Sequence, residues 1–176
     1  MVNKLSGLAV TAFLAEKIQD LKIAVIGDVM LDRYFHGEVK RISPEAPVPV
    51  TKINREKSVL GGATNVAANL AHLGCKVLMG GVTGDDDNRV LLEKLMDDAG
   101  IDYTGLVKSD KRKTITKMRV IGGTQQMLRL DFEETGDLFE GETAALSAWL
   151  EKLLEAGLDG LCRLYVGSGR AFCLVV

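Results

Sequence analysis

The sequence predicts an α/β protein with an open sheet of parallel strands, because strand patterns and helix patterns alternate along the chain. Lys22–Gly27 and Lys76–Val82 are continuous apolar runs, as is typical of strands buried on both faces of a parallel sheet. A helix-compatible segment at about 63–73 lies between them, and another at about 87–99 follows. This alternation of strands and helices predicts an α/β sheet.

Composition agrees with a globular protein of one domain, or of one domain with a small appendage. The chain has 176 residues, of which 47% are hydrophobic and 26% are charged. Its formal net charge is -2 and its sequence pI is about 5.7. A balance so close to neutral does not indicate a protein that binds nucleic acid or a membrane surface.

The cysteines and the N-terminal segment bear on location. Cys75, Cys162 and Cys173 form no CxxC pair, so neither a disulfide framework nor a zinc site is predicted. Lys4 and the apolar run Leu8–Ala15 have the outline of a signal peptide, but charged and polar residues follow at once. We therefore expect a cytoplasmic protein without a membrane span.

The stretch from Gly61 to Gly74 is the first candidate for a ligand site. Gly61 and Gly62 let the backbone approach a ligand closely, and the free N–H groups of the following helix would face that ligand. Asn65 adds a side chain that both donates and accepts hydrogen bonds. This combination suits a polyhydroxylated or phosphorylated small molecule, although a tight turn before a packed helix would explain the same residues.

Two segments interrupt the α/β pattern and predict a small antiparallel sheet outside the body. Residues 33–54 have the pattern of two short strands around the proline-rich link Ser43–Pro49. Thr114–Ile121 and Gln126–Phe132 alternate with period two around Gly122–Thr124, which predicts a hairpin. Such a sheet would serve as a lid over a cleft or as an oligomer interface.

Apolar spacing predicts which faces of the later helices are buried. In the helix at 87–99, the buried face is predicted to hold Val90, Leu91, Leu95 and Met96. A last helix at about 141–156 is predicted to bury Leu146, Trp149, Leu150 and Leu153.

Asp28 and Asp32 are the candidate acidic ligands for a sugar. Asp28 directly follows the first buried strand, and ligands of open α/β sheets bind beyond the carboxyl ends of the strands. A carboxylate there can accept hydrogen bonds from two sugar hydroxyls. A helix cap or a solvated acid would also account for either residue.

The other charged candidates are four cations and an acidic run. Arg33, Lys117, Arg119 and Arg129 lie on the predicted lid strands, where they would meet a substrate phosphate or form a solvated face. Asp85–Asp87 has the charge to attract a divalent metal, but helix capping is the simpler interpretation, so no metal site is predicted. The sequence contains neither a GxxxxGK[ST] loop nor GxGxxG spacing.

Several motifs together resemble the N-terminal half of a ribokinase-like (PfkB-type) sugar kinase over roughly residues 20–160. Within that family they are most similar to the D-glycero-β-D-manno-heptose 7-phosphate kinase module of the bifunctional heptose kinase/adenylyltransferase. The segments that carry the resemblance are Ile26–Tyr34, Arg41–Val50, Gly61–Asn69, Thr114–Lys117 and Gln125–Glu133.

The resemblance implies a Rossmann-like body with a β lid that also pairs subunits into a homodimer. It implies phosphoryl transfer from ATP, with Mg²⁺, to the anomeric hydroxyl of heptose 7-phosphate, for synthesis of the lipopolysaccharide core. Asp32 matches the aspartate with which the family grips the sugar, and Gly61, Gly62 and Asn65 match its substrate-side motif. Asp28 falls beside that grip.

The resemblance ends near residue 161. Residues 1–161 match the N-terminal part of the kinase domain, whereas 162–176 are unlike the family, whose catalytic base and ATP pocket lie further along the chain. We therefore expect this chain to hold the substrate side only, without a catalytic residue, and to be poorly soluble and inactive alone. The alternative interpretation is a module that binds sugar phosphate or dimerises without catalysis.

Overall fold

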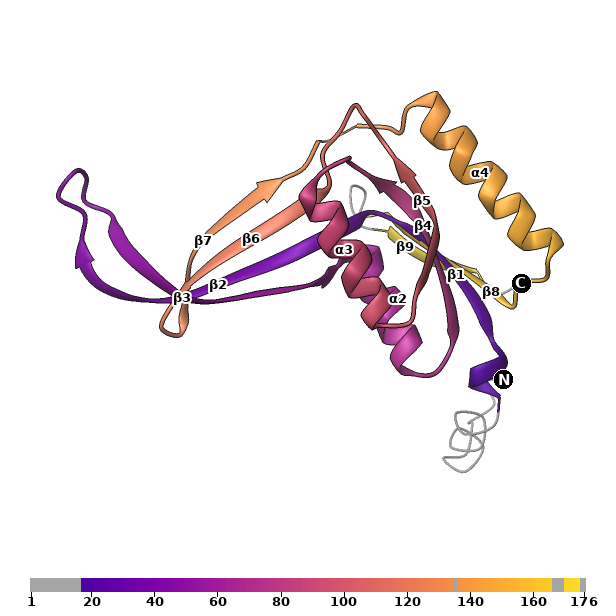
Figure 1. Cartoon of the computed structure of the whole chain (residues 1–176), viewed down its shortest axis with the longest axis horizontal. Helices are drawn as coiled ribbons and strands as arrows, with labels where there is room; N and C mark the ends of the chain where they lie inside the picture. The colour runs from indigo at the N-terminus through magenta and orange to yellow at the C-terminus, as the bar shows by residue number, and fades with distance from the viewer. Residues whose placement is uncertain (1–16, 135, 166–169, 175–176) are drawn as a thin grey trace.

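The protein has an α/β body from which a second sheet extends as an arm (Figure 1). The structure is a computed structural model, and it describes residues 17–134, 136–165 and 170–174. The signal-like segment considered above lies outside the described residues.

The body is built on a sheet with the strand order β5-β4-β1-β8-β9. Its strands are β1 (Lys22–Gly27), β4 (Lys76–Thr83), β5 (Asp102–Lys108), β8 (Gly160–Tyr165) and β9 (Arg170–Leu174). Neighbouring strands are parallel from β5 to β8, and β9 pairs with β8 in the antiparallel sense. The prediction of a parallel α/β sheet is confirmed. The resemblance to the family ends near residue 161, yet β8, which spans that position, still pairs with β1.

Helices cover both faces of this sheet. The helical elements are the short 3₁₀ turn η1 (Ile18–Asp20), α2 (Gly62–His72), α3 (Asp87–Asp98) and α4 (Glu140–Glu155). Met79 belongs to the core beneath α2 and α3, whereas its neighbour Gly80 meets Trp149 of α4. Since successive residues of a strand point to opposite faces, α4 covers the face away from α2 and α3. Among the described residues, no helix is both long enough and apolar enough to cross a membrane.

The buried face of α3 differs from the predicted one. Leu92 and Met96 are fully buried, Leu91 and Leu95 pack at the edge of the core, and Val90 is 65% exposed. The prediction for Val90 was wrong because the helix is turned so that Leu92 points into the core.

The second sheet, here called the lid, has the strand order β3-β2-β6-β7. Its strands are β2 (Val29–Ile42), β3 (Pro49–Gly61), β6 (Ile115–Gly122) and β7 (Gln125–Phe132). Both predicted hairpins are present, although β2 and β3 are longer than expected. The sheet is mixed rather than antiparallel, because β2 and β6 pair in parallel. β2 follows β1 after a single residue, whereas β6 follows β5 through a connector at 109–114, and the two hairpins meet along β2 and β6 (Figure 1).

Trp149 docks α4 on two glycines that pair across β4 and β5. A Cβ atom on Gly80 would lie 2.5 Å from the Trp149 ring, and one on Gly105 would lie 2.4 Å from it. We expect Gly80→Ala to lower the free energy of unfolding by about 1–3 kcal/mol, because the ring cannot stay where it is. Urea denaturation would measure this.

Gly141→Ala is the matched control, because an added Cβ there meets no atom within 4 Å. Its free energy of unfolding should be unchanged or slightly higher, since alanine favours the helix. Equal stabilities for Gly80→Ala and wild type would contradict the docking role of these glycines.

Candidate functional site

The turn that opens α2 is held against the start of β2. Gly62 has φ +54, in the left-handed region that favours glycine. The backbone N–H of Ala63 donates to the carbonyl oxygen of Asp28 at 3.0 Å. The buried hydroxyl of Thr64 donates to the Met30 carbonyl oxygen at 3.2 Å. The glycine turn is therefore fixed at the carboxyl end of β1.

Asp32 lies directly against this turn. A Cβ atom on Gly61 would stand 2.7 Å from Oδ2 of Asp32, so a side chain at Gly61 would displace the carboxylate. Gly61 is the N-cap of α2, and Asn65 is exposed one turn into that helix. The structure thus brings Asp32, Gly61 and Gly62 together, with Asp28 contributing the backbone contact that holds the turn.

The Asp32 carboxylate is paired with a cation from β6. Arg119 donates from its guanidinium to Oδ1 of Asp32 at 2.6 Å. The same guanidinium lies over the ring of Tyr34, 5.2 Å from its centroid. Both charged side chains are largely buried, so the pair is shielded from solvent.

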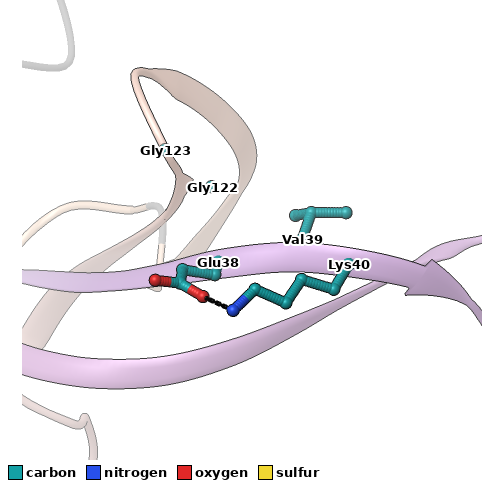
Figure 2. Close-up of a pocket in the computed structure, with 5 residues that line it drawn as sticks. All are labelled: Glu38, Val39, Lys40, Gly122 and Gly123. Carbon is teal, nitrogen blue, oxygen red and sulfur yellow. Dashed lines mark ion pairs between the residues drawn. The ribbon is translucent and has the colours of Figure 1, made fainter.

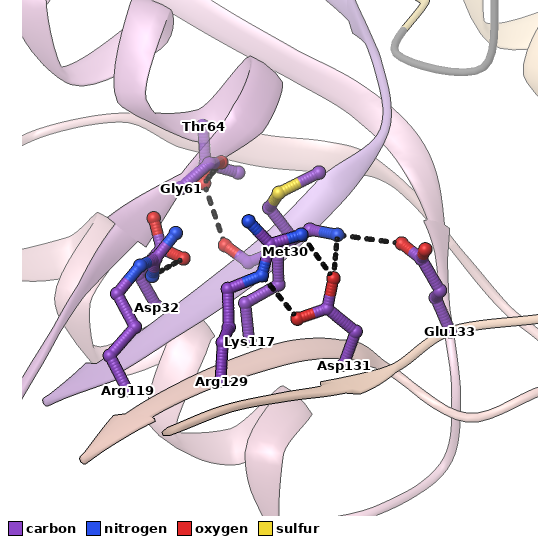
Figure 3. Close-up of polar contacts among 9 residues, drawn as sticks. All are labelled: Met30, Asp32, Gly61, Thr64, Lys117, Arg119, Arg129, Asp131 and Glu133. Carbon is purple, nitrogen blue, oxygen red and sulfur yellow. Dashed lines mark hydrogen bonds and ion pairs between the residues drawn. The ribbon is translucent and has the colours of Figure 1, made fainter. Parts of the chain in front are cut away.

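A row of charged side chains continues from Asp32 across β6 and β7 (Figure 3). The register places Asp32 beside Lys117, and Lys117 opposite Asp131. Lys117 donates to Asp131 at 3.1 Å and to Glu133 at 2.7 Å. Arg129 donates to both oxygens of Asp131, at 2.8 and 2.7 Å. We call Asp32, Lys117, Arg119, Arg129, Asp131 and Glu133 the charged row.

These contacts shift the pKa values of the row. The hydrogen bond from Arg129, followed by those of Lys117, lowers the pKa of Asp131 to about 2. Burial alone would lower the pKa of Lys117, but its hydrogen bonds with Glu133 and Asp131 outweigh burial and raise it. These shifts favour the ionised forms of Asp131 and Lys117 at neutral pH.

Arg33 does not join the charged row. It follows Asp32 on a strand, so it points to the opposite face of the lid. There it donates to Glu56 at 3.1 Å, and its guanidinium lies over the Phe35 ring. The period-two alternation of a strand already predicts that Arg33 and Asp32 point to opposite faces.

Sequence reasoning did not select Asp131 and Glu133 as site residues. Counting pairs back from the turn after Gly122 would place Lys117 opposite Leu130, and Asp131 would then point to the other face of the sheet. The structure instead has a register shift between Val120 and Ile121, with one extra residue in β7. This bulge brings Asp131 opposite Lys117.

The acidic run Asp85–Asp87 is a capping element, as expected. Asp86 accepts a hydrogen bond from the backbone N–H of Arg89 at 3.0 Å and caps α3. Asp85 pairs with Lys108 at the surface. Within the described ranges, no three His, Cys, Asp or Glu side chains are grouped to hold a metal ion.

Two hollows in the described surface lie away from the charged row. One, of about 360 Å³, lies where β2 extends past the β6–β7 turn, and Figure 2 shows its ion pair between Glu38 and Lys40. The other, of about 220 Å³, lies between the end of β5 and the start of α4. Neither is lined by a predicted site residue.

We expect Arg129→Gln to raise the pKa of Asp131 from about 2 toward its ordinary value of 3.8, because the largest cause of the shift is removed. A folded-state pKa this low means that Asp131 stabilises the fold above about pH 4 and loses that contribution as pH falls toward 2. A carboxyl NMR titration would measure the pKa. Arg119→Gln, which removes the partner of Asp32 instead, should leave the titration of Asp131 nearly unchanged. A midpoint near 2 in Arg129→Gln would contradict the assignment.

Comparison with known proteins places the chain in a family. The model of the pfkB family carbohydrate kinases matches residues 20–160. The chain is 46% identical over 138 residues to a D-beta-D-heptose 7-phosphate kinase of Bordetella bronchiseptica, covering 77% of this chain and 44% of the relative. It is 47% identical over 136 residues to the bifunctional protein HldE of a Marinomonas species, covering 77% of this chain and 28% of the relative. It thus spans less than half the length of these curated relatives.

A solved structure supports the fold. A carbohydrate kinase from Agrobacterium tumefaciens superposes with a TM-score of 0.53 and 23% identity, covering 63% of this chain and 35% of that one. The family match over residues 20–160 carries more weight than this likeness. The chain belongs to the pfkB family of carbohydrate kinases.

Proposed function

We propose that this chain forms the sugar-binding side of a kinase that phosphorylates D-glycero-β-D-manno-heptose 7-phosphate at its anomeric hydroxyl. The observation that carries the proposal is the Asp32 carboxylate seated against Gly61 at the opening of α2. The names of the relatives supply the substrate class and favour a kinase over a module that only binds. The reaction would serve ADP-heptose and lipopolysaccharide core synthesis in the cytoplasm.

The sugar end of the substrate would meet Asp32 and the start of α2. Asp32 accepts hydrogen bonds from sugar hydroxyls, and an ionised acceptor makes the stronger bonds. The backbone N–H groups of the first turn of α2, other than that of Ala63, would face the sugar, and Gly61 and Gly62 leave room for it to approach them. Asn65 adds a donor and an acceptor from the same turn, and Asp28 keeps the turn in place.

The phosphate end would meet the cations of the charged row. Lys117, Arg119 and Arg129 are balanced by Asp32, Asp131 and Glu133, so the row is neutral as a whole. A phosphate would bind by taking the place of a carboxylate. Arg129 already donates to both oxygens of Asp131, and the same two N–H groups could bind two phosphate oxygens. We leave Arg33 out of this role because it points away.

Family membership implies ATP as the phosphoryl donor. Mg²⁺ would accompany ATP in the intact enzyme, but the described residues offer no cluster suited to the ion, and neither hollow is lined by the sugar-side residues. The described residues therefore do not form a site that fits Mg·ATP. No described residue is assigned as a catalytic base.

We expect Asp32→Asn to weaken the binding of heptose 7-phosphate by about 10- to 150-fold, because a hydrogen bond to a charged acceptor contributes about 1.5–3 kcal/mol. Isothermal titration calorimetry on the 176-residue chain would measure the dissociation constant. Glu56→Gln is the matched control, since Glu56 pairs with Arg33 on the opposite face and should bind like wild type. Equal affinities for Asp32→Asn and wild type would contradict the site, and a wild-type chain that does not bind would contradict the proposal.

We also propose that the apolar face of the lid pairs two copies of the chain. The face opposite the charged row carries Leu128, Leu130 and Phe132, which are 51%, 41% and 47% exposed. Phe35, Met118 and Val120 alternate onto the same face from β2 and β6. Apolar side chains gathered on one side of a sheet favour burial against another protein surface, and the like face of a second lid is the partner we propose.

Leu130→Lys should shift the chain from dimer to monomer, because the apolar contact cannot enclose an unpaired ammonium group. Size-exclusion chromatography with light scattering would report the mass. Lys57→Ser is the control, since Lys57 is exposed and pairs in register with Tyr34, on the face of the charged row. A monomeric wild-type chain would contradict this proposal.

A further inference from the structure

The connector between β5 and β6 is tied to the body by one carboxylate. Oδ1 of Asp86 accepts the hydrogen bond from Arg89 that caps α3, and Oδ2 accepts one from the backbone N–H of Thr114 at 2.9 Å. In return, the Thr114 hydroxyl accepts a hydrogen bond from the backbone N–H of Gly84 at 3.1 Å. Thr114 is 1% exposed and directly precedes β6. The two oxygens of Asp86 thus join a body helix to the base of a lid strand.

Gly84 is a second, independent observation that the connector packs closely against the body at this junction. A Cβ atom on Gly84 would lie 2.7 Å from Oδ2 of Asp86, 2.7 Å from the Thr114 nitrogen and 2.8 Å from the Arg112 carbonyl oxygen. Two of these atoms belong to the backbone and cannot yield by rotating a side chain. Any residue larger than glycine would therefore push the connector away from Asp86.

The connector is held from its other side by the start of α4. Arg112 donates to the carbonyl oxygen of Asp137 at 3.0 Å and lies 3.4 Å from the buried Glu142 carboxylate. Its guanidinium also lies over the ring of Phe139. With both sides fixed, β6 leaves the body at one place and in one direction.

The anchored strand carries two cations of the charged row. Lys117 and Arg119 follow Thr114 by three and five residues on β6. The helix that presents the sugar-side N–H groups, α2, belongs to the body instead. The distance between the two ends of the proposed substrate site therefore depends on how the lid is set on the body.

We propose that Asp86 is a positioning residue that sets the lid cations at a fixed reach from the start of α2. This rests on the proposed function of the charged row. Ionisation of Asp86 agrees with the geometry, because the hydrogen bonds from Thr114, Arg89 and Asn88 outweigh burial and lower its pKa.

Asp86→Asn separates this role from helix capping. Asparagine keeps one oxygen, which caps a helix about as well as aspartate does. The amide group that replaces the other oxygen carries only donors and cannot accept from the N–H of Thr114. The variant therefore keeps the cap of α3 and releases β6. Asp85→Asn is the matched control, since Asp85 lies at the surface and pairs there with Lys108.

The experiment measures dissociation constants for heptose 7-phosphate and for the same heptose without phosphate. In Asp86→Asn, the preference for the phosphorylated sugar should fall by about 5- to 10-fold, because the lid cations lose their fixed reach. Amide exchange read by NMR should become faster in Ile115–Arg119 and stay unchanged in α3. Gly84→Ala should reproduce both effects without removing a charge, and Asp85→Asn should show neither.

Two results would overturn the proposal. One is unchanged exchange at Ile115–Arg119 in Asp86→Asn. The other is an equal loss of affinity for both sugars, which a merely structural role would produce. A wild-type chain that binds neither sugar would count against the proposed function, whereas the exchange measurement still tests the Asp86 anchor by itself.

Discussion

The structure depends on the near-continuity of β1 and β2. β1 ends at Gly27 and β2 begins at Val29, so the lid starts one residue beyond the carboxyl end of a central body strand. A Cβ on Gly27 would lie 2.0 Å from the carbonyl oxygen of Leu164, so the strands are packed too tightly here for any side chain. Asp32 is thereby fixed close to the edge where open α/β sheets bind ligands. The position of the lid follows from the same junction, because β3 returns along β2 and leads straight into α2.

Much of the body could be predicted from the sequence, because continuous apolar runs and helical spacing are local signals. In the lid, local sequence patterns predict the strands but not how the strands pair. Alternation predicts that residues such as Met118 and Val120 lie on a strand, but not which strand lies beside them. The parallel pairing of β2 with β6 depends on the direction in which each leaves the body, which only the fold of the whole chain determines.

The arrangement of the candidate site residues could be predicted only in part, for a similar reason. Asp32 and Gly61 are distant in sequence, and their proximity rests on the pairing of Met30 with Gly61. Family resemblance supplied that pair, whereas residue chemistry alone left Asp32 open to other interpretations. Asp131 was missed because a single extra residue in β7 changes the face of every side chain beyond it. No composition or spacing rule applied to Lys117 alone reveals that shift.

Each cation of the charged row is paired with a carboxylate, and burial explains why. A partly buried ammonium or guanidinium group is costly without a counter-charge, and Lys117 is only 12% exposed. Asp131 and Glu133 keep such cations ionised in the absence of a ligand. In the proposed function, an anionic substrate group would exchange one ion pair for another, so the selectivity of the row would depend on geometry more than on net charge.

The bulge in β7 has a further consequence for the lid as a whole. It places Arg129 and Asp131 on the face of the charged row, and Leu128 and Leu130 on the opposite face. Without the extra residue, each hairpin face would mix charged and apolar side chains. An apolar interface would then bury unpaired charges, and the substrate side would expose leucines to water. One inserted residue therefore keeps the charged and the apolar side chains on opposite faces of one thin sheet, which is the separation that the proposed sugar-phosphate site and the proposed subunit contact would each require.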